Sequence, residues 1–298
     1  MLGDHSQLAG AALVLADMGL IGVAAARQWS SFGLGLLAAA LIALTPAHFM
    51  YAHSAPQALA ILPFVLFWLL AVAAFERGGQ LLALLVGGLA LGIGCYSARP
   101  AIVLMPLYLA MTIALAGWRG GHRAWATIVF AFVLSTLPAL IWLAWHPDMY
   151  ATYINRYGLY DASHLNPLQG AKDFLNYNNV QERISIYWDY FDPVYIFGVL
   201  PVALALFLPA GVYQLLKRRT PMDILLIAGL LTSPVAAVLA NERYIVRRQL
   251  VIIPFAILIA VAGVDGLLRN RSLVWRAVAV AGLLAIPLEV ILSAFSAL

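Results

Sequence analysis

Hydrophobic residues run almost continuously along this chain, in stretches of about 17 to 24 residues that short polar breaks separate. A helix of about 20 apolar residues is long enough to cross the hydrocarbon core of a bilayer. The pattern predicts ten such helices, at residues 8–26, 31–50, 57–75, 80–96, 100–117, 124–145, 193–216, 222–240, 249–268 and 273–296. We therefore expect an all-α protein, a polytopic transmembrane helical bundle that forms a single membrane domain over residues 1–298.

The composition excludes other classes of protein. Of the 298 residues, 64% are hydrophobic and 10% are charged, whereas a soluble domain has about 45–50% apolar and about 25% charged residues. A transmembrane barrel is excluded because its strands alternate apolar and polar residues. The net charge of +4 reflects lysines and arginines at helix ends, so it indicates no nucleic-acid partner. Cys95 is the one cysteine and can form no internal disulfide.

Basic residues at the breaks predict an orientation, because cytoplasmic loops collect lysine and arginine. Ten of them lie at one set of alternate breaks and seven at the other, with three of the seven inside the long polar stretch 146–192. We expect the first set in the cytoplasm. Both termini and residues 146–192 then lie on the outer face, and 146–192 is an extracytoplasmic loop.

This loop is rich in aromatic residues. Four tyrosines recur at spacings of 3, 4 and 3 residues, on one face of a helix: Tyr150, Tyr153, Tyr157 and Tyr160. Tyrosine favours the membrane interface, so we expect an interfacial helix. The later run SIYWDYFDPVYIF holds Tyr187, Trp188, Asp189 and Asp192. Aromatic rings beside acids suit sugar binding, and an interfacial role accounts for them equally well.

Arginines gather at the outer breaks, against the usual charge bias. The segment CYSARP carries Arg99, and NERYIVRRQ carries Arg243, Arg247 and Arg248. Guanidinium groups bind phosphate or carboxylate through paired hydrogen bonds, which favours an anionic ligand. Pairing with Glu242 and nearby carbonyls, or with lipid headgroups, is the alternative.

Asp17 interrupts the first apolar run, where a carboxylate is costly. A hydrogen bond between helices explains it better than a proton or ion relay, because a relay needs acidic partners in other spans. His48 and His53 are five residues apart, a spacing that does not place two ligands on one helix face. The sequence therefore predicts no metal site.

Several segments resemble the GT-C superfamily, the integral-membrane glycosyltransferases that use polyprenyl-phosphate-linked sugars. The similar segments follow in the family's order over residues 8–270: VLADMGLIGVAAARQW, TPAHFMYAHSAPQ, LGIGCYSARPAIVLMPLYL, ERISIYWDYFDPVYIFGVLP and NERYIVRRQLVIIPFAILIAVAGVDGLL. The resemblance is to enzymes that transfer mannose or aminoarabinose in a bacterial inner membrane, with the site facing the periplasm. It implies transfer of a sugar from a polyprenyl-phosphate-linked donor to an extracytoplasmic glycan, lipid or protein.

The resemblance also implies roles for particular residues. The leaving phosphate would be stabilised by Arg99, Arg243, Arg247 and Arg248. Sugar or acceptor would be positioned by His53, Gln57, Tyr187, Trp188, Asp189 and Asp192. No cofactor is identified, and a divalent cation is compatible with the family's chemistry.

The chain departs from the family at its start. The family's first helix and large first outer loop, which usually carries the catalytic acid, have no counterpart, and only MLGDHSQ precedes the first predicted span. We expect either a missing upstream segment or a shortened homologue. Asp4 is the one acid before that span and is the candidate catalytic residue. Two alternatives stay open: a non-catalytic GT-C-derived subunit with a membrane-protein partner, and a transporter or flippase of a lipid-linked or anionic solute.

Overall fold

The computed structural model describes residues 2–146 and 177–296, and within these ranges every regular element is a helix. The elements are α1 (Leu2–Trp29), α2 (Phe32–Ala43), α3 (Pro46–Ser54), the short 3₁₀ helix η1 (Pro56–Ala58), α4 (Leu62–Gly78), α5 (Leu81–Gly94), α6 (Ala101–Trp145), α9 (Tyr177–Asp189), α10 (Pro193–Val199), α11 (Leu204–Arg218), α12 (Pro221–Thr232), α13 (Val235–Leu239), α14 (Val246–Gln249), α15 (Ile252–Leu268) and α16 (Leu273–Ser296). The predicted all-α fold class is confirmed. The four tyrosines at 150–160 lie outside the described residues.

The long helices coincide with the apolar runs of the sequence, whereas α9 lies in the polar stretch 146–192. Within the described residues, five helices are long and apolar enough to cross a membrane, or seven if two bent pairs each count as one span. The pairs are α2 with α3, bent by 55°, and α10 with α11, bent by 100°. Three shorter apolar helices occupy the remaining predicted ranges: Leu81–Gly94, Ala101–Leu115 and Ile252–Leu268. The chain is thus an integral membrane protein, and a full count of ten spans stays a prediction.

Proline and glycine explain where the long runs bend. Pro46 opens α3, and Thr45 before it has the extended backbone (φ −76°, ψ 119°) that a following proline favours. In α6, Gly121 has φ 62° and ψ −161°, which divides the helix into two parts. Only glycine adopts that conformation without steric cost.

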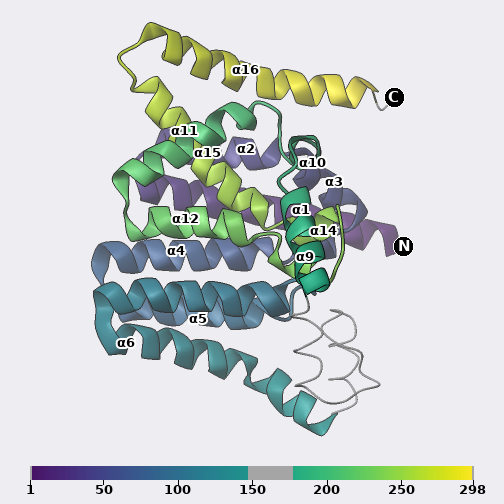
Figure 1. Cartoon of the computed structure of the whole chain (residues 1–298), viewed down its shortest axis with the longest axis vertical. Coiled ribbons are helices and arrows are strands. Elements are labelled where there is room, and N and C mark those ends of the chain that lie inside the picture. Colours follow the sequence, from purple (N-terminus) through teal and green to yellow (C-terminus); the bar gives the residue numbers. More distant parts are fainter. Residues whose placement is uncertain (1, 147–176, 297–298) are drawn as a thin grey trace.

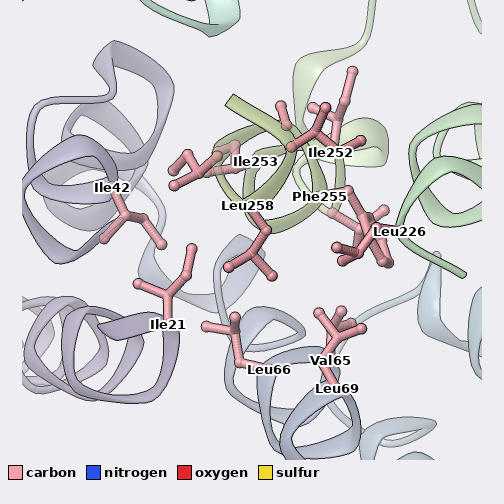
Figure 2. Close-up of a cluster of buried hydrophobic side chains, with 14 of the residues drawn as sticks. Ile21, Ile42, Val65, Leu66, Leu69, Leu226, Ile252, Ile253, Phe255 and Leu258 are labelled. Carbon is pink, nitrogen blue, oxygen red and sulfur yellow. The ribbon is translucent and has the colours of Figure 1, made fainter. Parts of the chain in front are cut away.

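Helix α15 lies at the centre of the bundle and contacts α1, α2, α4, α11, α12 and α16. Fourteen of its residues are buried, which matches a sequence that is apolar on every side. Figure 2 shows side chains from four neighbouring helices converging on it, including Ile21 of α1, Ile42 of α2, Leu66 of α4 and Leu226 of α12.

Small residues let the helices approach closely, as is common where helices pack in membranes. Gly211 of α11 lies against the backbone carbonyl of Ile259 in α15, and Gly263 of α15 lies against the carbonyl of Phe207 in α11. Gly22 and Gly35 make the same kind of contact between α1 and α2. A Cβ at Gly211, Gly263 or Gly35 would lie within 2.6 Å of a backbone oxygen, so these contacts set the spacing of the helices.

The bundle has two ends that differ in content (Figure 1). One end, which we call the α9 end, holds α3, α9, α10, α14 and the N-terminal end of α1, on the right in Figure 1. The opposite end holds the turns from α4 to α5 and from α11 to α12. The breaks at residues 95–100 and 241–248, which carry Arg99 and Arg243, Arg247 and Arg248, therefore share the α9 end.

Candidate functional site

The loop between α13 and α14 has an unusual backbone. Asn241 and Tyr244 both have positive φ, 52° and 56°, a conformation that asparagine tolerates better than tyrosine. The Tyr190 hydroxyl holds this loop, since it donates to the carbonyl of Glu242 (2.7 Å) and accepts from the amide of Ile245 (3.1 Å). Burial raises the pKa of Tyr190 to about 12, so the hydroxyl keeps the proton that it donates.

Glu242 points from this loop to Arg248 on α14. The Nε and Nη2 atoms of Arg248 donate to the two carboxylate oxygens of Glu242, at 2.6 and 3.0 Å. The side chain of Arg248 is only 5% exposed, so this paired hydrogen bond compensates for its burial. For Arg248, the predicted alternative of pairing with Glu242 is confirmed.

Two further arginines act on the same carboxylate. The hydrogen bond from Arg248 lowers the pKa of Glu242, and the positive charges of Arg248, Arg247 and Arg99 lower it further, against the opposing effect of burial. Arg99 lies between α5 and α6, far from Arg247 in sequence, and both side chains are exposed. The fold therefore brings three arginines from two separate breaks around one acid.

The fourth predicted arginine joins this group through α9. Arg243 Nη1 donates to Asp189 Oδ2 at 2.7 Å, and both side chains remain in contact with solvent. We define the arginine cluster as Arg99, Arg243, Arg247 and Arg248 together with Glu242 and Asp189. Among the residues that the structure describes, the cluster joins four guanidinium groups with two carboxylates, so these six side chains together carry a net positive charge.

The predicted aromatic run lies beside the cluster on α9. The rings of Tyr187, Trp188 and Phe191 contact one another with centroids 5.2 to 6.1 Å apart. The Tyr187 hydroxyl donates to the carbonyl of Leu231, whereas Trp188 is 62% exposed. Trp188 thus presents an exposed ring at the end of α9, and the next residue, Asp189, is the partner of Arg243.

Asp192 has a local partner instead. Its Oδ1 accepts from the amide of Val194 at 2.8 Å and caps the N-terminus of α10. Arg183 was not among the predicted site residues, and its Nη1 donates to the carbonyls of Val238 (2.6 Å) and Leu239 (2.9 Å). These contacts join α9 to the end of α13, and thereby set the position of Asp189 relative to Arg243.

The remaining candidates lie on other elements. His53 Nδ1 is 3.0 Å from the carbonyl of Phe49 on its own helix α3, and its ring lies against that of Phe49. Gln57 is exposed in η1. Asp4 falls within α1, and its side chain lies outside the described part of the structure. The assignment of these three residues to the site stays a prediction.

A divalent cation has no evident place among the described residues. Among the side chains that the structure describes, no three from His, Cys, Asp or Glu lie close enough together to hold a metal ion. Asp189 and Glu242, the acids of the cluster, are each paired with an arginine.

In comparisons with known proteins, no family model and no curated protein matches this chain. The class defined by fold and site is therefore an all-helical integral membrane protein with a cationic, aromatic cluster at one end.

Proposed function

We propose that this protein binds a polyprenyl-phosphate-linked sugar at the arginine cluster and transfers the sugar to an extracytoplasmic glycan, lipid or protein acceptor. The observation that supports it is the excess of guanidinium groups over carboxylates at one end of an apolar bundle. A phosphate with a long hydrocarbon chain suits such a place, because its charge meets the arginines and its chain stays in the bilayer. Transfer follows from the resemblance to GT-C enzymes.

Each part of the cluster has a role in this proposal. The bond between the anomeric carbon and the phosphate oxygen breaks, and the phosphate keeps the electron pair. Arg99 and Arg247 are exposed and stabilise the negative charge that develops there. Trp188 offers its face to the sugar ring. The acceptor oxygen forms the new bond to the anomeric carbon and loses its proton as it attacks, and the partly exposed carboxylate of Asp189 is the proton acceptor within the cluster.

The same proposal sets the orientation of the protein. In this proposal the α9 end lies on the extracytoplasmic side, the periplasmic face of a bacterial inner membrane, because the breaks at the opposite end carry more lysine and arginine. Polyprenyl-phosphate sugars that have crossed that membrane would reach the cluster from the bilayer.

Binding of a polyprenyl phosphate to the purified chain in lipid nanodiscs tests this proposal. A charge-assisted hydrogen bond contributes about 1.5–3 kcal/mol, so Arg247→Ala should weaken binding by about 10- to 100-fold. Arg271→Ala is the matched control, because Arg271 is an exposed arginine in the turn from α15 to α16, away from the α9 end. Equal weakening by both variants, or no saturable binding to the unmodified chain, would contradict the proposal.

Consumption of the donor separates an enzyme from a binding subunit. The chain incubated with a polyprenyl-phosphate sugar and an acceptor should release free polyprenyl phosphate. Binding without release would favour the non-catalytic subunit.

Transport is a second candidate, and one observation favours it: a buried pair of ionisable side chains, Asp17 and His48, inside the bundle. Exchange of labelled for unlabelled solute across proteoliposomes would distinguish a transporter or flippase from a transferase. The unlabelled solute would be a lipid-linked sugar present on both sides.

A further inference from the structure

Asp17 and His48 meet inside the apolar bundle. Asp17 lies near the middle of the span Gln7–Trp29 and His48 lies on α3, after the bend at Pro46. Asp17 Oδ2 and His48 Nε2 are 3.0 Å apart, and the two side chains are 0% and 1% exposed. The hydrogen bond between helices predicted for Asp17 is therefore present, and its partner is a residue that can itself carry a proton.

The charge of the pair depends on how many protons it holds. With no proton the pair is a buried anion, and with two it is a buried cation. With one proton its net charge is zero, either as a carboxylic acid beside a neutral imidazole or as a carboxylate beside an imidazolium. A net charge in an apolar interior is costly, so burial favours the state with one proton.

Within the part of the chain that the structure describes, the other charged groups near this pair lie toward the ends of their helices. α2 and η1 contain no titratable residue. On α1, Arg27 is ten residues beyond Asp17, about 15 Å along the helix. The other titratable residues on the elements packed against α1 and α3 are Asp4 and His5 of α1, Tyr51 and His53 of α3, Glu76 and Arg77 in the last turn of α4, Tyr195 of α10 and Asp265 near the end of α15.

Each partner also keeps one polar atom without a hydrogen bond. Asp17 Oδ1 and His48 Nδ1 are buried and have no hydrogen-bond partner among the described residues. A purely structural contact would be better served by a neutral side chain such as asparagine, which costs less to bury. A carboxyl and an imidazole differ from such a side chain in that each can take up and release a proton.

We propose that Asp17 and His48 together form a buried proton-binding site that holds one proton while α1 and α3 are packed. Water that enters between α1 and α3 when they separate would let the two groups titrate independently, and the pair would then release its proton near neutral pH. α3 also contacts α10, which belongs to the α9 end. A movement of α10 that displaces α3 would therefore be linked to proton uptake or release by the pair. This proposal does not depend on sugar transfer.

Spectroscopy of the purified full chain in nanodiscs tests the proton count directly. Infrared absorption separates a carboxylic acid from a carboxylate, and Asp17→Asn assigns the band. Nitrogen NMR separates neutral imidazole from imidazolium, and the exposed His53 is the internal reference for a histidine in contact with solvent. Between about pH 5 and pH 8, where an unperturbed histidine titrates, we expect the two groups to hold one proton throughout. A carboxylate beside a neutral imidazole in that range would overturn the proposal.

The two single variants give a second test with opposite signs. In His48→Gln the Asp17 carboxyl has no basic partner, and burial favours its neutral, protonated form. The unfolding temperature of this variant should therefore fall as pH rises. In Asp17→Asn the His48 imidazole has no acidic partner, and burial favours its neutral form. The unfolding temperature of this variant should therefore fall as pH decreases. The unmodified chain keeps one proton on the pair when folded and loses it when unfolded above the ordinary histidine pKa of about 6.5, so its unfolding temperature should fall as pH rises through that value. Slopes of the same sign in both variants would also overturn the proposal, and if either variant fails to fold, the spectroscopic test on the unmodified chain decides.

Discussion

Glu242 determines how the arginine cluster responds to acid. The hydrogen bond from Arg248 is the main cause that lowers the pKa of Glu242 in the folded protein. The interaction therefore stabilises the fold fully at a pH at which the carboxylate is ionised in both the folded and the unfolded protein. The stabilisation is complete above the ordinary glutamate pKa of about 4.3 and is lost as pH falls through the lower folded value. The unfolding temperature of the unmodified chain should therefore drop in acid, below about pH 4.

Glu242→Gln should remove this part of the acid response. At neutral pH the variant should be less stable by about 1–3 kcal/mol, because Arg248 is buried and loses its charged partner. The difference in stability between the variant and the unmodified chain should become smaller as pH falls, because Glu242 itself becomes protonated. Glu182→Gln on the exposed side of α9 is the control, and an equal effect of that variant would show that the response is not specific to Glu242. Thermal unfolding in detergent over a series of pH values measures both.

Tyr96 supports α6 where a proline interrupts it. Its hydroxyl donates to the carbonyl of Ser135 (3.0 Å) and accepts from the amide of Ala139 (3.2 Å), two groups that bond each other in a regular helix. Pro138 lies between them. Tyr96→Phe should destabilise the protein by about 0.5–2 kcal/mol, since both backbone groups lose a partner in an apolar setting. Tyr213→Phe, at an exposed position of α11, should leave the unfolding temperature unchanged.

At the scale of elements, the contact between α11 and α15 depends on glycine. A Cβ at Gly211 would overlap the carbonyl oxygen of Ile259, a backbone atom that cannot move aside as a flexible side chain does. Gly211→Ala should therefore push α11 from α15 and cost about 1–3 kcal/mol. A Cβ at Gly19 of α1 would meet no atom within 4 Å, so Gly19→Ala should be neutral or stabilise by up to about 1 kcal/mol. Loss of stability in both variants, measured by thermal unfolding, would indicate a general effect of glycine replacement and would contradict this account of the packing.

The sequence predicts elements better than it predicts their contacts. A membrane helix needs a continuous apolar run, so the helices could be located from hydrophobicity alone. The bends inside 31–50 and 193–216 were not predicted, because Pro46 and Pro201 interrupt runs that stay apolar on both sides. Successive breaks were assigned to opposite ends of the bundle, and this assignment correctly predicted that Arg99 and Arg247 lie at the same end. The pairing of Asp17 with His48, 31 residues apart, leaves no periodic signal in the sequence.

For the whole molecule, the proposed orientation can be tested with one span. Helix α4 has an exposed glutamine before it, Gln57, and another after it, Gln80. In a Cys95→Ser background, we introduce Gln57→Cys or Gln80→Cys and treat intact cells with a maleimide that does not cross membranes. The α9 end lies outside in our proposal, so Gln57→Cys should react in intact cells and Gln80→Cys only after the membrane is opened. The two positions are matched in residue type and exposure, so their chemistry does not favour either one. The reverse pattern would place the arginine cluster in the cytoplasm and would exclude an extracytoplasmic acceptor, whereas labelling of both in intact cells would show that α4 does not span.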